Sequence, residues 1–301
     1  MVIEHILKDE SLDLAPYIAG HTGDRAVTYK VVDNEPIHLS FFYPPHFEPN
    51  RRYPAFLFVH GGGWRSRKIF ADQAGWGGDH LGYLARYYAD RSFVCVSIDY
   101  RLADKYAQAA GKQLSDLYED CYDAVEYVLR HLAENGIDEK NIYLLGESAG
   151  GWLAGALATF HYRPTHQFKK VFLVNAITDL SNDLGWSAYV PQYPDNGALA
   201  SLSIEKRAEF LSPDQQITAS TCPVVLIHGA NDRCVSFLHS ERFHARMEQL
   251  GRPCHLHRLE DTDHAFLLAE YTDNLSACLL GIRILDKEIQ YAFDEENAPI
   301  E

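Results

Sequence analysis

Runs of apolar residues recur along the chain at a spacing that predicts a buried sheet. Five runs are almost wholly apolar: 54–60, 93–98, 141–145, 170–175 and 223–228. Strands that helices cover on both faces have this pattern, which is typical of parallel sheets. Residues 26–32 and 37–43 alternate instead, with the turn-like 33–36 between them, and predict an antiparallel pair. A further strand at 254–259 brings the total to about eight.

Helical patterns separate these predicted strands. The helical segments are 79–90, 113–134, 237–250 and 273–291. In the second of them, apolar residues fall on one face at helical spacing: Leu117, Cys121, Ala124, Val128 and Leu132. Alternation of strand and helix favours the α/β class. We therefore predict a mostly parallel central sheet of about eight strands, with helices on both faces, and one domain over residues 1–301.

Residues 178–220 interrupt this order. They lie between two predicted buried strands and are too long for a simple crossover. We interpret them as a small cap insertion with a short helix near 203–210, lying over the carboxyl ends of the strands. Three aromatic residues of this segment and one from the loop after 54–60 are candidates to line a substrate pocket, although such residues also pack in cores: Trp186, Tyr189, Tyr193 and Trp64.

Composition narrows the classes of partner. The 301 residues carry a formal net charge of −15, which disfavours binding to nucleic acid and to anionic lipid. The amino terminus has no secretory-signal pattern, and no run approaches the ~18 apolar residues of a membrane span. Six scattered cysteines without a signal favour free thiols and a cytoplasmic protein. The sequence leaves the oligomeric state open and allows a homodimer.

One motif predicts a nucleophile. Residues 146–150 read Gly-Glu-Ser-Ala-Gly, directly after a predicted strand and before a helix, which matches the turn that holds a reactive serine at Ser148. A serine hydroxyl needs an adjacent base and an acid that orients this base, in the chain order Ser, Asp or Glu, His. Asp232 and His264 each follow a predicted strand in that order. They are our candidates for the acid and the base.

Two further groups bear on this chemistry. Glu260, Asp261 and Asp263 are alternative acids, but near neighbours of His264 in sequence rarely have room to fold back onto it. The loop His-Gly-Gly-Gly-Trp at 60–64 also follows a buried strand, and glycines let the backbone approach a ligand closely. We therefore predict an oxyanion hole in which the donors are three backbone amides: those of Gly62, Gly63 and Ala149.

One pair of histidines is a candidate metal site. His255 and His257 alternate on a predicted strand and so point to one face, where they could hold a metal. No third ligand at a suitable spacing is evident from the sequence. We therefore interpret them as part of a solvated edge strand and predict no metal.

Several motifs together resemble those of the α/β-hydrolase carboxylesterases, in particular the hormone-sensitive-lipase-like and acetyl-esterase branch. They are HGGGW at 60–64, SIDYRLA at 97–103, GESAGG at 146–151, HGANDRCV at 228–235 and DTDHAF at 261–266. The resemblance implies a serine esterase without metal or organic cofactor, in which Asp99, Tyr100 and Arg101 support the glycine loop. The family's segment usually continues as Ala-Pro-Glu, whereas this chain has Ala-Asp-Lys at 103–105.

The expected activity is hydrolysis of small-molecule carboxylic esters with a short acyl group, through an acyl-enzyme on Ser148. The glycine loop is also similar to that of kynurenine formamidases, so an arylformamidase or another amide hydrolase is the alternative enzyme. A catalytically inactive ligand-binding protein on the same fold is the alternative outside enzymes, but binding alone would not need all three triad residues.

Overall fold

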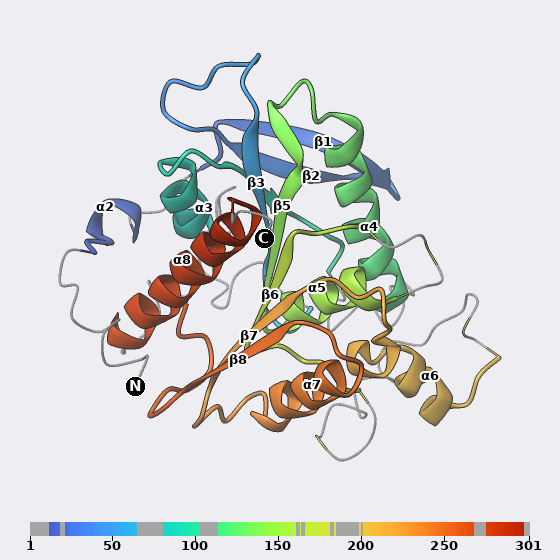
Figure 1. The fold of residues 1–301 in the computed structure, drawn as a ribbon. Helices are drawn as coiled ribbons and strands as arrows, with labels where there is room; N and C mark the ends of the chain where they lie inside the picture. The colour runs from blue at the N-terminus through green and yellow to red at the C-terminus, as the bar shows by residue number, and fades with distance from the viewer. Residues whose placement is uncertain are drawn as a thin grey trace.

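The computed structural model describes residues 12–18, 22–64, 81–102, 114–160, 163, 166–180, 184, 199, 201–267 and 275–297. An eight-stranded sheet runs through its centre in the order β1-β2-β4-β3-β5-β6-β7-β8 (Figure 1). The strands are β1 (Arg25–Val32), β2 (Glu35–Phe42), β3 (Tyr53–Val59), β4 (Val94–Ile98), β5 (Ile137–Glu147), β6 (Lys170–Val174), β7 (Val224–Gly229) and β8 (Cys254–Leu259). Pairing is antiparallel from β1 through β2 to β4 and parallel across the other strands. The predicted mostly parallel sheet is confirmed.

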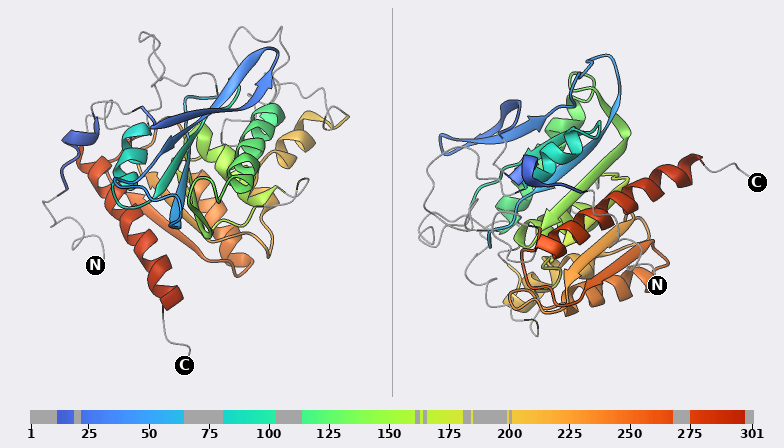
Figure 2. Two further views of the ribbon diagram at one scale, coloured as in Figure 1. Left: turned by 90° about the horizontal axis from the view of Figure 1, so that it is seen from above. Right: turned by 90° about the vertical axis from the view of Figure 1, so that its left-hand side faces the viewer.

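Helices cover both faces of the sheet. The described helices are α2 (Ala15–Ile18), α3 (Gly82–Ala89), α4 (Leu114–Arg130), α5 (Ala149–Thr159), α6 (Ile204–Phe210), the 3₁₀ helix η4 (Pro213–Gln216), α7 (Leu238–Gln249) and α8 (Leu275–Asn297). One apolar core joins the sheet to α4, α5 and α7, and a second joins its other face to α3 and α8. Figure 2 shows α3 and α8 on one side of the sheet and α4 and α5 on the other. The predicted covering of both sheet faces by helices is thus confirmed.

Only part of the predicted cap insertion lies within the described residues. Of 178–220, the structure describes 178–180, 184, 199 and 201–220. The short helix expected near 203–210 is α6, which begins after Ser203, whose hydroxyl accepts a hydrogen bond from the Lys206 amide at 3.3 Å. The segment is attached to α5 through Trp152, whose indole donates to the Leu211 carbonyl at 2.7 Å. Its position over the strand ends stays a prediction.

The parallel strands bring four loops to one edge of the sheet. The chain leaves β3, β5, β7 and β8 at their carboxyl ends, which is where open α/β sheets hold their sites. Register supports this, because Val59 at the end of β3 pairs with Gly146 near the end of β5.

None of the helices within the described residues is both long and apolar enough to cross a membrane.

Candidate active site

Ser148 occupies a strained turn between β5 and α5. Its φ of 54° and ψ of −117° are sparsely populated by residues other than glycine, and its amide donates to the Val174 carbonyl at 2.9 Å. The glycines on either side are required by close backbone contacts. A Cβ on Gly146 would lie 2.2 Å from the Gly150 carbonyl oxygen, and one on Gly150 would lie 2.2 Å from that of Val59. The predicted strand–turn–helix geometry is therefore present.

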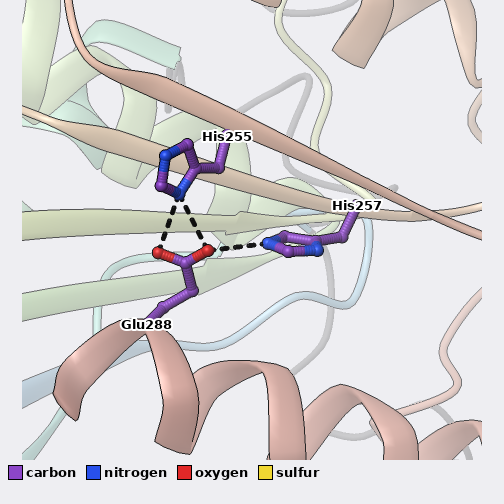
Figure 3. A group of neighbouring side chains, drawn as sticks. All are labelled: His255, His257 and Glu288. Carbon is purple, nitrogen blue, oxygen red and sulfur yellow. Dashed lines mark hydrogen bonds and ion pairs between the residues drawn. The ribbon is translucent and has the colours of Figure 1, made fainter. Parts of the chain in front are cut away.

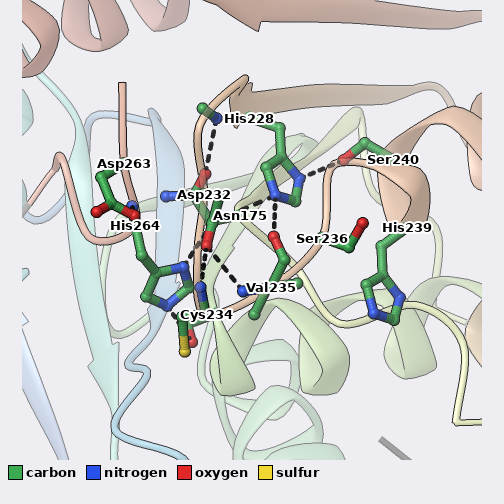
Figure 4. Close-up of polar contacts among 12 residues, drawn as sticks. Asn175, His228, Asp232, Cys234, Val235, Ser236, His239, Ser240, Asp263 and His264 are labelled. Carbon is green, nitrogen blue, oxygen red and sulfur yellow. Dashed lines mark hydrogen bonds and ion pairs between the residues drawn. The ribbon is translucent and has the colours of Figure 1, made fainter. Parts of the chain in front are cut away.

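The structure brings together the three residues predicted to form a triad. His264 Nε2 lies 2.9 Å from the Ser148 hydroxyl oxygen. His264 Nδ1 lies 2.7 Å from Asp232 Oδ2 (Figure 4). The second oxygen of Asp232 accepts the amides of Cys234 at 2.8 Å and Val235 at 2.7 Å. The acid is thus fixed by the loop after β7, and the imidazole bridges it to the serine.

A buried histidine that sequence reasoning missed supports the acid. His228 Nε2 lies 3.3 Å from Asp232 Oδ2 and 2.9 Å from the Val235 carbonyl oxygen. Its Nδ1 lies 2.7 Å from the Ser240 hydroxyl (Figure 4). Because Val235 O can only accept, the network assigns the proton of the neutral ring to Nε2, which therefore also points toward the Asp232 carboxylate. His228 lies within HGANDRCV, but histidine at a strand end carries no distinctive signal.

Electrostatics favour a charged acid and a basic imidazole. Burial alone would raise the pKa of Asp232, but hydrogen bonds from His228 and His264 outweigh this and hold it well below its usual range. Burial alone would lower the pKa of His264, but the bond to Asp232 and the nearby carboxylates of Glu147 and Asp263 raise it above its ordinary value. Proton affinity is thus concentrated on the residue that contacts Ser148.

Glu147 is a second acid that the sequence did not reveal. It is buried directly before Ser148, and its Oε1 lies 4.0 Å from His264 Nε2. Burial raises the pKa of Glu147 to about 7, although His264 opposes the shift. The motif leaves this position variable, so only the fold shows that the side chain faces the base.

Two of the three alternative acids near His264, Asp263 and Glu260, have other partners. Asp263 accepts the Arg233 amide at 3.0 Å and the Arg233 Nε at 2.6 Å, and it caps the His264 amide at 2.8 Å. Glu260 is exposed and lies 2.9 Å from Arg258. Within the described residues, Asp232 is the carboxylate that contacts the imidazole of His264 directly.

The glycine loop is held open by its neighbours. Gly62 and Gly63 have φ values of 97° and 62°, which favour glycine, and Ala149 stands at the start of α5, where helix amides have no intrahelical partner. Tyr100 donates its hydroxyl to the His60 carbonyl at 2.8 Å and stacks on the His60 ring at 4.3 Å. This contact agrees with the supporting role that the resemblance implies for Tyr100.

Arg101 of the same segment has a different partner. Its guanidinium binds the buried carboxylate of Asp120 on α4 through two bonds, of 2.7 and 2.9 Å. Within the described contacts, Arg101 therefore secures the loop after β4 to α4 and does not reach the glycine loop. Asp99 lies 3.7 Å from His60 Nε2 and is close enough to support that ring.

The prediction that Trp64 lines a substrate pocket is corrected by its burial in the structure. Its side chain has no exposed surface, its indole donates to the Ala149 carbonyl at 3.0 Å, and its ring meets Trp152 edge-on at 5.8 Å. A fully buried side chain in these contacts braces the turn after Ser148 and does not line an open pocket. The other predicted pocket residues lie outside the described residues: Trp186, Tyr189 and Tyr193.

The structure places a third potential ligand, which the sequence did not reveal, beside His255 and His257. Glu288 of α8 packs against β8 and lies within hydrogen-bond distance of both imidazoles. It is 31 residues from His257 in sequence, a separation that no local spacing rule could connect.

Comparisons with known proteins agree with this geometry. A family model described as BD-FAE matches residues 39–247, more than half of the chain. A thermophilic esterase from Thermogutta terrifontis, Est2, is similar in structure: its TM-score is 0.71 at 25% identity, over 93% of this chain and 95% of that one.

The curated relatives match this chain over only part of their own length. A probable isoprenylcysteine alpha-carbonyl methylesterase from Oryza sativa subsp. japonica is 27% identical over 80% of this chain and 57% of its own. Arylacetamide deacetylase from Oryctolagus cuniculus is 34% identical over 44% of this chain and 30% of its own. The chain thus spans between about a third and somewhat over half of the length of these relatives.

Proposed function

Because this chain belongs to the BD-FAE family and has the α/β-hydrolase fold, we propose that it is a serine carboxylesterase that acts on small-molecule esters. The observation that carries the proposal is the continuous chain of contacts from Asp232 through His264 to Ser148, at 2.7 and 2.9 Å. Nucleophile, base and orienting acid are held at hydrogen-bond distance, as acyl transfer through a serine requires.

The proposed reaction has two halves. In the first, the Ser148 oxygen bonds to the ester carbonyl carbon while His264 Nε2 takes its proton. The carbonyl oxygen becomes an oxyanion, for which we propose the amides of Gly62, Gly63 and Ala149 as donors, each worth about 2.7–4 kcal/mol of barrier. His264 then gives the proton to the leaving alcohol as the C–O bond breaks. In the second half, His264 deprotonates a water whose oxygen bonds to the acyl carbon. The bond between that carbon and the Ser148 oxygen then breaks, the carboxylic acid leaves, and Ser148 takes the proton back from His264.

Asp232 acts through His264. Its carboxylate accepts a hydrogen bond from His264 Nδ1, which fixes the tautomer in which Nε2 is free to accept the serine proton. Its negative charge also stabilises the imidazolium that forms. His228 and the amides after Asp232 satisfy the remaining lone pairs of this buried carboxylate. The acid is therefore held charged and in place before substrate binds.

The proposal extends to substrate class and compartment. We propose a short acyl group, with Trp186, Tyr189 and Tyr193 closing the acyl pocket, and action in the cytoplasm, with which six free cysteines are consistent. Amide or formamide cleavage is the alternative with a specific basis, because one relative is named a deacetylase of arylacetamides. N-formylkynurenine and an aryl acetamide therefore belong in the same assay as the esters.

The first test is removal of the nucleophile. Ser148→Ala is expected to lower kcat for p-nitrophenyl acetate by on the order of 10⁶, because the acyl-enzyme cannot form. A fluorophosphonate probe should label the wild type and not this variant. Ser203→Ala removes a hydroxyl from the start of α6 and is the matched control, which should keep both activity and labelling. Labelling that persists in Ser148→Ala would reject the assignment.

A further inference from the structure

We propose that His255, His257 and Glu288 form a binding site for one divalent transition-metal cation of the zinc class, which joins the edge strand β8 to the helix α8. The three side chains converge from two elements that are distant in sequence (Figure 3). One ligand atom from each lies within 4.8 Å of the others. The proposal does not depend on the esterase activity.

The geometry follows from the elements that carry the ligands. His255 and His257 are two residues apart on β8, so both point to the face that α8 covers. Glu288 projects from α8 between them: its Oε1 is 2.9 Å from His255 Nδ1 and 2.8 Å from His257 Nε2. An edge strand and a helix thus supply the three donors, with no contribution from a loop.

The donor set fits a particular class of cation. Two imidazole nitrogens and one carboxylate suit Zn²⁺, with bonds of about 2.0–2.2 Å and a fourth position for water. Tetrahedral ligands at those bond lengths lie roughly 3.3 Å from one another, so the His–Glu spacings of 2.8–3.0 Å need a small opening. The two imidazole nitrogens lie within 4.8 Å of each other, a separation that small side-chain movements can adjust. The His255 side chain is 60% exposed and has room to make that adjustment.

The Glu288 carboxylate already has a cationic neighbour, Lys170. Glu288 has a nearly buried side chain whose carboxylate lies within hydrogen-bond distance of His255, His257 and Lys170. Lys170 lies 3.1 Å from Glu288 Oε2 and donates to the Glu288 carbonyl at 2.8 Å. This ammonium shares the carboxylate and should weaken metal binding.

The location sets the role of the site. His255 is the second residue of β8, whereas His264 follows the other end of that strand, so the cation would bind away from Ser148. A ligand that binds only the folded state stabilises that state by mass action. The expected role is a clamp between the sheet edge and α8, separate from catalysis.

The test measures binding of Co²⁺ and Zn²⁺ by the metal-free full chain. Wild type should bind one Co²⁺ with visible d–d absorption, which one equivalent of Zn²⁺ displaces, and Zn²⁺ should raise Tm. His257→Gln should weaken Zn²⁺ binding by at least ~100-fold, since even losing an outer-shell partner costs ~10–100-fold. Lys170→Met should tighten it, because the competing ammonium is gone.

Two variants guard the interpretation. His255→Gln changes the exposed ligand, so the site can be tested even if His257→Gln fails to fold. His244→Gln removes a histidine 3.5 Å from Glu248 on α7 and should leave Co²⁺ and Zn²⁺ binding unchanged. Absence of a Zn²⁺-dependent rise in Tm in wild type, equal binding by His255→Gln, or loss of binding in His244→Gln would each overturn the proposal.

Discussion

At the scale of single residues, the base works between two buried carboxyl groups with opposite behaviour. Asp232 is held charged by the hydrogen bonds that it accepts, whereas Glu147 is pushed toward its neutral form by burial. Among the described residues, Asp232 is the carboxylate that contacts Nδ1 of His264, while Glu147 lies 4.0 Å from Nε2, the nitrogen that contacts Ser148. The charge of Glu147 therefore acts on the proton affinity of the base and not on its orientation.

This arrangement predicts a change in pH dependence for Glu147→Gln. Ionised Glu147 raises the pKa of His264, so its removal should let His264 lose its proton at lower pH. The rising limb of kcat/KM should then move to lower pH. The folded-state pKa of Glu147, about 7, lies above its ordinary 4.5, so this carboxyl costs wild type stability as pH rises through that window, by up to about 3 kcal/mol. The variant should be spared that loss.

Two measurements check this: the pH profile of kcat/KM, and Tm between pH 5 and 8. Glu260→Gln is the matched control, because it removes an exposed carboxylate near His264 in sequence that does not face the imidazole. It should leave both profiles unchanged. A limb that stays in place in Glu147→Gln, whatever the height of the profile, would contradict the role given to this residue.

Residues differ in how far the sequence could predict them. Ser148, Asp232 and His264 could be placed because each follows a strand whose carboxyl end the fold brings to one edge. Glu147 could not, because the G-x-S-x-G motif allows any side chain at that position. Glu288 could not, because helix-to-strand packing across 31 residues leaves no local pattern. The sequence could not show that Trp64 is buried, because an aromatic residue beside a glycine loop can pack inward as readily as it can face the substrate.

At the scale of elements, the turn between β5 and α5 depends on the packing of α5 against β3. Gly150 lets the helix approach closely enough that a Cβ there would meet two backbone oxygens, of Val59 at 2.2 Å and His60 at 2.4 Å. Val59 is the last residue of β3, and His60 is the first residue of the glycine loop. The same contact thus fixes the nucleophile and the proposed oxyanion hole relative to each other.

Gly150→Ala is therefore expected to be damaging, and Gly155→Ala is its matched control on the same helix. Backbone atoms cannot rotate away, so Gly150→Ala should cost at least ~3 kcal/mol of unfolding free energy, the upper part of the usual overpacking range, and most of kcat. At Gly155 a Cβ would lie 3.2 Å from the side chain of Pro213, and the change should stay within ~1 kcal/mol. Urea unfolding of both variants, together with esterase assays, checks this. Equal stability of the two would show that the close approach is not required.

Elements were predictable where burial leaves a clear period. Continuous apolar runs placed the buried strands, and α7 spans Leu238–Gln249 within the predicted 237–250. Boundaries were less certain: α4 ends at Arg130, four residues before the prediction, and α8 continues to Asn297, six residues beyond it. Helix ends depend on capping contacts and on what lies alongside, which apolar spacing does not contain.

At the scale of the whole molecule, the net charge and the exposed surface of the predicted cap indicate which class of substrate reaches the site. The chain carries a formal net charge of −15. On α6, within the predicted cap, the ion pair of Lys206 and Glu209 at 2.6 Å is exposed, and Ala208 is the buried residue. Leu202 and Ile204 add only a small exposed apolar area beside it. A lid that opens onto lipid is broadly apolar, and an acidic surface is repelled by anionic membranes.

These properties predict a preference for short acyl chains in water. Acetate or butyrate p-nitrophenyl esters should have kcat/KM at least about 10-fold above decanoate, because a pocket closed by aromatic side chains discriminates against added methylenes. No activation should appear on adding a lipid–water interface. Trp186→Ala should shift the preference toward longer chains, and Leu202→Ala, an exposed residue of the same segment, should not. A wild-type maximum at decanoate would reject the small pocket while leaving the proposed triad untouched, because the proposal assigns selection of chain length to the cap and bond cleavage to Ser148, Asp232 and His264.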